Sequence, residues 1–147
     1  MNLKKVFSGC LALLFVLVVS ACGANGVNGN GKVTELDLEE VKAFTNDKKT
    51  GFLYVESWLE SDKEEDQMNL KEIEDVAKAE KIDFYVFDAN KLPESEFTEN
   101  NVNKKILKQY SKTFGFYKDG ELKGEFDFDD EQDLKTFVKE MKSNYLE

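Results

Sequence analysis

Short apolar runs recur along the chain beyond residue 33, and stretches with one apolar face separate them. Residues 52–55 and 82–87 are continuous, β-prone runs, a pattern typical of strands that are covered on both faces. Shorter or alternating runs predict three more strands, at 33–36, 113–117 and 122–128. In the last of these, charged residues alternate with apolar ones, which predicts an edge or half-exposed strand.

Apolar residues at spacings of three and four predict four helices between and after these strands. Asp37 and Glu40 form a capping box at the start of the first helix, and Ser61 with Glu64 has the same signature. The helices are expected to begin at Asp37, at Ser61, at 102 and at Asp129 or Asp130.

The predicted order is therefore β-α-β-α-β-α-β-β-α, within a single domain at 33–147. Alternation of strands and helices implies an α/β fold with parallel strands and with helices on both faces of the sheet. Asp119-Gly120 is a strong two-residue hairpin signal, so the last two strands should pair antiparallel. The expected architecture is a three-layer sandwich around a mixed sheet.

Residues 1–21 have the features of a secretion signal, with basic Lys4 and Lys5 followed by an apolar run. The run is short for a membrane-spanning helix. It ends in small residues before Cys22, and this sequence resembles the bacterial lipobox. The resemblance implies that Cys22 becomes the lipidated first residue of the mature chain. A signal anchor, or an ordinary cleaved signal with an incidental Cys22, is the alternative.

Residues 22–32 are rich in glycine and asparagine, so we expect a flexible tether between the lipidated Cys22 and the domain. The domain would then lie at the outer face of a bacterial cytoplasmic membrane, held there by the lipid on Cys22. The other cysteine, Cys10, lies within the signal. The mature domain would therefore have no free thiol and no disulfide.

The composition of the chain limits the classes of function that it can have. The chain has no histidine and no arginine. This excludes metal sites and catalytic sites that use imidazole, and phosphate sites that use a bidentate guanidinium. Its net charge of −10 disfavours nucleic acid and favours a cationic peptide or protein as a partner. The acids of 127–133 lack the central glycine of a calcium loop, and those of 60–66 are expected to form a solvated face. No metal and no other cofactor is expected.

Several segments together resemble thioredoxin over the whole of 33–147. Residues 52–58 are similar to the central strand that ends in tryptophan before the active-site motif, and Tyr110 matches a tyrosine near the end of the family's third helix. Residues 116–121 resemble its hairpin, and 134–137 its last helix. The resemblance implies a thioredoxin-like fold.

The active-site motif of that family is missing. Leu59 and Asp62 stand where the family has its two cysteines, and Lys112 stands near the position of its cis-proline. Thioredoxin chemistry needs a reactive thiolate and a second thiol beside it. The resemblance therefore implies the scaffold and no dithiol oxidoreductase activity.

Trp58 follows the predicted central strand, at the edge of the sheet where ligands of α/β folds bind. With Leu59, Asp62, Lys112 and Phe114 it is the candidate for a binding groove that takes a peptide. The alternative is a packing role for Trp58. No catalytic residue is predicted.

The leading hypothesis for function is a lipid-anchored, redox-inactive thioredoxin-like domain that acts as a binding or accessory module. It is generally similar to the thioredoxin-like accessory proteins of bacteriocin systems. One alternative is an immunity-type lipoprotein that sequesters a cationic antimicrobial peptide. Another is a thiol-independent enzyme that uses the same groove.

Overall fold

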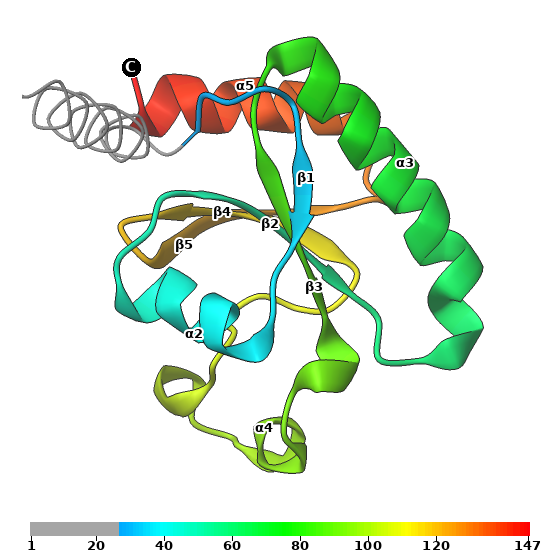
Figure 1. Ribbon diagram of the computed structural model, residues 1–147, viewed down its shortest axis with the longest axis vertical. Coiled ribbons are helices and arrows are strands. Elements are labelled where there is room, and N and C mark those ends of the chain that lie inside the picture. Colours follow the sequence, from blue (N-terminus) through cyan, green and yellow to red (C-terminus); the bar gives the residue numbers. More distant parts are fainter. Residues whose placement is uncertain (1–26) are drawn as a thin grey trace, which may run out of the picture.

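A computed structural model of the protein describes residues 27–147 (Figure 1). Five strands form one sheet in the order β1-β3-β2-β4-β5. The strands are β1 (Val33–Glu35), β2 (Gly51–Glu56), β3 (Phe84–Asp88), β4 (Thr113–Lys118) and β5 (Glu121–Asp127). The helices are α2 (Leu38–Asn46), α3 (Lys63–Glu80), α4 (Glu94–Thr98) and α5 (Leu134–Tyr145). Strands β1, β3 and β2 are parallel, and β4 runs antiparallel to both β2 and β5. The predicted mixed α/β fold is confirmed.

Helices cover both faces of the sheet, and consecutive residues of β2 point to opposite faces. Phe52 and Tyr54 pack in a cluster with apolar residues of α3 and α5, whereas Leu53 and Val55 pack in a second cluster with α2. In Figure 1, α3 and α5 accordingly lie on one side of the sheet and α2 on the other. The side chains at 52–55 are all buried because strands pair along both edges of β2 and helices cover both of its faces.

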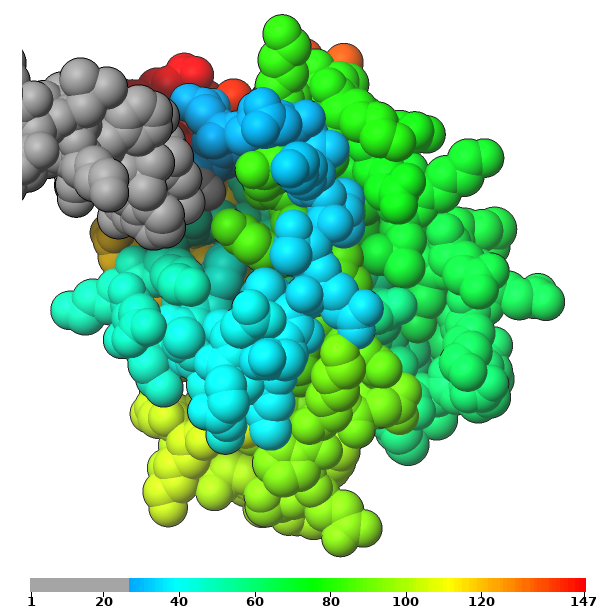
Figure 2. Space-filling view, viewed as in Figure 1, coloured from blue at the N-terminus to red at the C-terminus, as the bar shows by residue number. Residues whose placement is uncertain are grey.

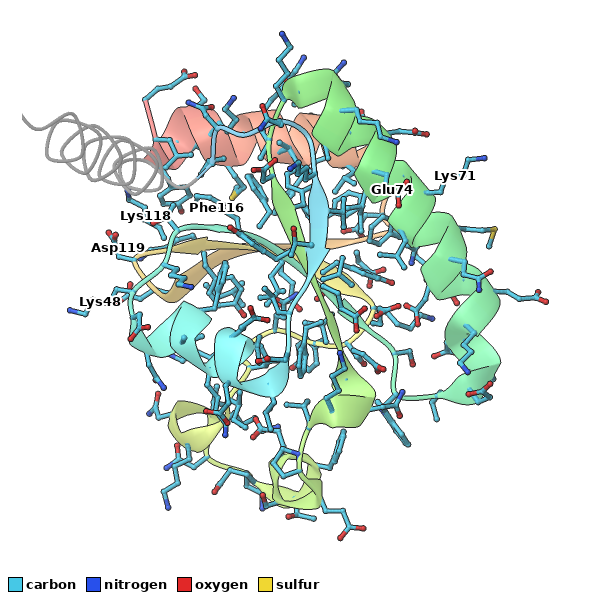
Figure 3. All side chains as sticks on the ribbon, in the orientation of Figure 1. Lys48, Lys71, Glu74, Phe116, Lys118 and Asp119 are labelled. Atoms are coloured by element: carbon cyan, nitrogen blue, oxygen red, sulfur yellow. The ribbon has the colours of Figure 1, made fainter. Side chains whose placement is uncertain are left out.

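The turn between β4 and β5 has the predicted Asp119-Gly120 sequence. Both residues have positive φ angles, 53° and 77°, as a type I′ turn requires. The tip also contacts the loop after α2, because Asp119 N–H donates to Thr50 Oγ1 at 3.0 Å and Gly120 N–H donates to Lys49 O at 2.9 Å. Figure 3 shows Lys48 and Asp119 at this end of the molecule, while Lys71 and Glu74 point outward from α3.

The predicted third helix at 102–110 is wrong. Only Val102–Lys104 form a turn of 3-10 helix, and the following residues bury Leu107 and Gln109 while Lys108 and Tyr110 are exposed. Burial at alternate positions is typical of an extended segment. The helix of this region is instead α4, which begins directly after its N-cap residue, Pro93.

Two predicted helix starts also differ. Ser61 Oγ donates to Asp62 Oδ1 at 3.2 Å instead of capping α3, and Glu60–Asp62 form a 3-10 turn that leads into that helix. Neither Asp129 nor Asp130 caps α5. Asp133 does so, because its Oδ1 accepts a hydrogen bond from Thr136 N–H at 2.9 Å. At Asp37 the predicted capping box is confirmed.

The N-terminal segment is held to the domain from residue 27 onward. Val27 is buried in the cluster beneath α3 and α5, and Asp83 Oδ1 accepts hydrogen bonds from the backbone N–H groups of Asn30 and Lys32. Residues 27–32, predicted as part of the tether, therefore pack against the domain. The predicted signal at 1–21 and the lipid on Cys22 lie outside the described residues. Within 27–147, no helix combines the length and the apolar character needed to cross a membrane.

Candidate functional site

Large apolar side chains that remain exposed gather at one end of the sheet. They lie in the segments that follow β2 and β3 and precede β4, and they are Trp58, Leu59, Phe97, Val102 and Tyr110. Trp58 is 51% exposed and Tyr110 is 79% exposed. A concentration of apolar surface on one part of a protein marks a binding site more often than scattered residues do.

A pocket of about 200 Å³ opens among these residues. Trp58 and Phe97 stand beside each other at its mouth, with ring centroids 5.8 Å apart, and exposed Tyr110 also lines it. Buried apolar side chains line its interior, and polar side chains lie among them. These further lining residues are Val55, Ala89, Leu92, Leu107, Glu96, Lys105, Gln109 and Ser111. In Figure 2, the segment around residues 90–105, in yellow-green, protrudes at the lower end of the molecule.

The pocket shares only Trp58 with the predicted groove. Phe114 is fully buried and stacks on Phe52, with ring centroids 5.5 Å apart, so it cannot line an open groove. The reason is its register in β4, which directs Phe114 toward the cluster beneath α3 and α5. Leu59 is exposed but does not line the pocket.

The side chains of Asp62 and Lys112 each have hydrogen-bond partners in the domain. Ser57 Oγ donates to Asp62 Oδ2 at 2.7 Å, and this hydrogen bond lowers the pKa of the Asp62 carboxyl. Lys112 N–H donates to Val55 O at 2.6 Å, and Lys112 Nζ lies 2.8 Å from Glu65 Oε2, a contact that raises the pKa of the Lys112 ammonium. The Asp62 side chain therefore holds the loop after β2 together, and the Lys112 side chain ties the start of β4 to α3.

The sequence prediction missed Phe97 and Tyr110 as pocket residues. Phe97 is the only aromatic residue in the acidic, asparagine-rich stretch from 94 to 103, and such an isolated apolar residue was the available signal. The sequence predicts Tyr110 on a helix that does not form. The pocket forms where three separate segments meet. A pattern within one segment cannot reveal which segments the fold brings together.

A buried polar network lies behind the loop that carries Trp58. Tyr54 O–H donates to Asp66 Oδ1 at 2.6 Å, and Ser57 N–H donates to Asp66 Oδ2 at 3.0 Å. Asn69 Nδ2 donates to Tyr54 Oη at 3.1 Å. Burial, and then the hydrogen bond to Asp66, raise the pKa of Tyr54. Asp66 is therefore not part of the predicted solvated face, and it fixes the chain where β2 ends and the Trp58 loop begins.

Glu56, the last residue of β2, gives the domain a predicted pH dependence. Burial raises its pKa, and the nearby carboxylates of Asp66 and Asp88 raise it further. An acid whose pKa is higher in the folded protein favours folding while it is protonated, and its contribution is lost as the pH rises through that pKa. Glu56→Gln removes the charge, so we expect its melting temperature at pH 7 to exceed that of the wild type by a few degrees.

The difference should shrink as the pH falls through the raised pKa of Glu56 and disappear below the ordinary pKa of a glutamate, where the side chain is protonated in both states. Thermal unfolding followed by circular dichroism from pH 3 to pH 8 measures it. Glu72→Gln, on the exposed face of α3, is the control and should show no such trend. A Glu56→Gln variant that is less stable than the wild type at pH 7 would contradict the prediction.

Within residues 27–147, no three acidic side chains are arranged to hold a metal ion. What the pocket offers is apolar surface, two aromatic rings side by side and a few polar groups. Such a lining suits non-covalent recognition of another molecule. A comparison of the chain with models of known protein families gives no match, and a comparison with curated proteins gives none either.

Proposed function

We propose that this protein is an exported lipoprotein, anchored to the outer face of a bacterial membrane by lipid on Cys22, whose thioredoxin-like domain binds a partner without redox chemistry. The sheet order β1-β3-β2-β4-β5 supports the proposed scaffold, as do helices on both faces and a closing hairpin and helix. The absence of redox chemistry is supported by the sequence, because no residue after Cys22 is a cysteine. Leu59 and Asp62 stand at the two positions where thioredoxins have cysteines, and Lys112 stands near the position of their cis-proline.

The observation that carries a binding role is the pocket beside Trp58. Its exposed aromatic rings come from the loop after the central strand β2 (Trp58), from α4 (Phe97) and from the segment before β4 (Tyr110), and a partner can reach all three. Tryptophan and tyrosine contribute much of the energy in protein interfaces, because they bury a large area at a small cost in conformational entropy.

The charge of the domain favours a cationic partner. The chain carries 30 acidic residues against 20 basic ones. The two segments that supply Trp58 and Phe97 are themselves acidic, with Glu60, Glu94 and Glu99 among their members. An acidic surface accelerates the approach of a basic peptide and disfavours acidic competitors.

The same charge also favours a second candidate function, the sequestration of a cationic antimicrobial peptide. A domain anchored outside the membrane would meet such a peptide before it inserts into the bilayer. Under either function, binding should weaken as salt is added, because screening reduces the attraction between opposite charges.

Trp58 is the single tryptophan, so its fluorescence can report on the pocket directly. We expect a capped peptide of eight alternating lysines and leucines to change this fluorescence in a saturable way. Phe97→Ala removes the ring beside Trp58 and should weaken binding about tenfold, as the loss of an interface aromatic typically does.

The matched control is Tyr145→Ala, since Tyr145 is also a partly exposed aromatic residue on a helix but lies away from the pocket. Its affinity for the peptide should equal that of the wild type. The proposal is contradicted if Phe97→Ala and Tyr145→Ala bind alike, or if a peptide with glutamate in place of lysine binds as tightly.

A further inference from the structure

Glu96 is a buried carboxylate at the pocket. It belongs to α4, lines the pocket and is only 9% exposed. Its Oε1 accepts a hydrogen bond from Ile106 N–H at 2.7 Å. Among residues 27–147, no lysine forms an ion pair with Glu96, and its Oε2 accepts no hydrogen bond. A largely buried carboxylate with one free oxygen is a preferred partner for a cation.

The side chains around Glu96 suit a cation that has an apolar stem. The faces of aromatic rings attract cations, and Trp58 and Phe97 supply two rings at the mouth. Val55 and Leu107 are buried in the core behind the pocket and offer apolar contact. Lysine has this combination, because its methylene chain packs on apolar surface while its ammonium binds polar groups.

We infer that this pocket takes the side chain of a lysine from the bound peptide, with the ammonium at Glu96 and the methylene groups against the apolar interior. The inference rests on the proposed binding function. A volume of about 200 Å³ corresponds to roughly seven water molecules, which leaves room for four methylene groups and an ammonium.

The geometry at Glu96 selects lysine over arginine. A guanidinium binds a carboxylate best through two parallel hydrogen bonds, one to each oxygen. Ile106 N–H already takes one lone pair of Oε1, so a bidentate guanidinium would have to share that oxygen with a backbone donor. A single oxygen is sufficient for the point charge of an ammonium.

Lys105 also lines the pocket, and its positive charge opposes a second cation. Within the described chain it forms no ion pair. Replacing it with glutamine should therefore strengthen the binding of a lysine peptide by a few fold. An anionic ligand would give the opposite result, since Lys105 would then be its counter-charge.

The test uses one capped peptide, Gly-Ser-Leu-Xaa-Leu-Ser-Gly, with lysine, arginine, acetyl-lysine or norleucine at the variable position. Titrations at low salt are followed by Trp58 fluorescence and by calorimetry. We expect the lysine peptide to bind at least about tenfold more tightly than the norleucine and acetyl-lysine peptides, the range of a charge-assisted hydrogen bond. Arginine should bind more weakly than lysine.

On the protein side, Glu96→Gln keeps the acceptor for Ile106 N–H and removes the negative charge. It should abolish the preference for lysine over norleucine, while Glu94→Gln, an exposed neighbour on the same helix, should retain it. Because the peptide series needs no variant of the protein, a folding defect in Glu96→Gln cannot decide the outcome.

The possible failures are distinguishable. Norleucine or arginine binding as tightly as lysine would overturn the lysine site and leave the pocket as a general peptide site. A loss of affinity in Lys105→Gln would overturn it in favour of an anion. If none of the four peptides binds, the proposed binding function fails together with the lysine site.

Discussion

Asp66→Ala should lower the free energy of unfolding by about 2–4 kcal/mol, because it leaves two buried donors without acceptors. The donors are Tyr54 O–H and Ser57 N–H, which lie 2.6 and 3.0 Å from the two carboxylate oxygens. Tyr54 is fully buried, so water cannot replace the lost acceptor without opening the core between β2 and α3. Denaturation in urea followed by circular dichroism measures the change.

The matched control is Asp75→Ala, which replaces the same residue type on the exposed face of the same helix. A surface substitution of this kind changes stability by less than about 0.5 kcal/mol. A double-mutant cycle with Tyr54→Phe isolates the hydrogen bond to Asp66, and we expect a coupling energy of about 1–2 kcal/mol. Equal losses for Asp66→Ala and Asp75→Ala would show that the buried network does not stabilise the fold.

The effect should extend to the pocket. Asp66 fixes Ser57 N–H, and Ser57 Oγ in turn accepts a hydrogen bond from Leu59 N–H at 3.1 Å and donates to Asp62. Trp58 lies between Ser57 and Leu59, and these hydrogen bonds hold both of them. Its position beside the pocket thus depends on a carboxylate of α3 that the pocket does not contain.

Central strands and local turns could be predicted from the sequence because each leaves a complete signal in one segment. The run at 52–55 is apolar throughout because both faces of β2 are covered. The capping box at Asp37 and the turn at Asp119-Gly120 depend on residues a few positions apart, so their chemistry is visible without the fold.

The third helix could not be predicted, because the apolar spacing in 102–110 fits a helix although only 102–104 form a 3-10 turn and 105–110 form no helix. Its conformation depends on contacts with distant residues. Ile106 N–H binds Glu96 of α4, and Gln109 Nε2 donates to Leu53 O and to Thr113 O, each at 3.0 Å. These tertiary hydrogen bonds override a weak local preference for helix.

The pocket and the buried network were missed for a related reason. Trp58, Phe97 and Tyr110 belong to three segments that only the fold brings together. Asp66 stands in a run of acids at the start of α3, and its neighbours Glu64 and Glu65 show the same pattern without being buried. Which of these acids is buried depends on how α3 is rotated relative to the sheet. The composition of the acidic run does not reveal this rotation.

Gly120→Ala should also lower the free energy of unfolding by about 2–4 kcal/mol. Gly120 has a φ of 77°, a conformation that costs a residue with a side chain about 1–2 kcal/mol. A Cβ at this position would also clash with Thr45 O. Because this oxygen belongs to the backbone of α2, relief requires the hairpin to move away and to lose the hydrogen bond from Gly120 N–H to Lys49 O.

Gly124→Ala is the matched control, since Gly124 lies on β5 of the same hairpin and does not have a positive φ. Its added Cβ would meet Met141 Sδ at 2.6 Å, but a methionine side chain can move aside. We expect a loss below about 1 kcal/mol, partly offset by the smaller conformational entropy of the unfolded chain. Urea denaturation of both variants decides the matter. If Gly120→Ala were no less stable than Gly124→Ala, the hairpin tip would not be held against the loop after α2, because the close approach of these two backbones is what separates the two glycines.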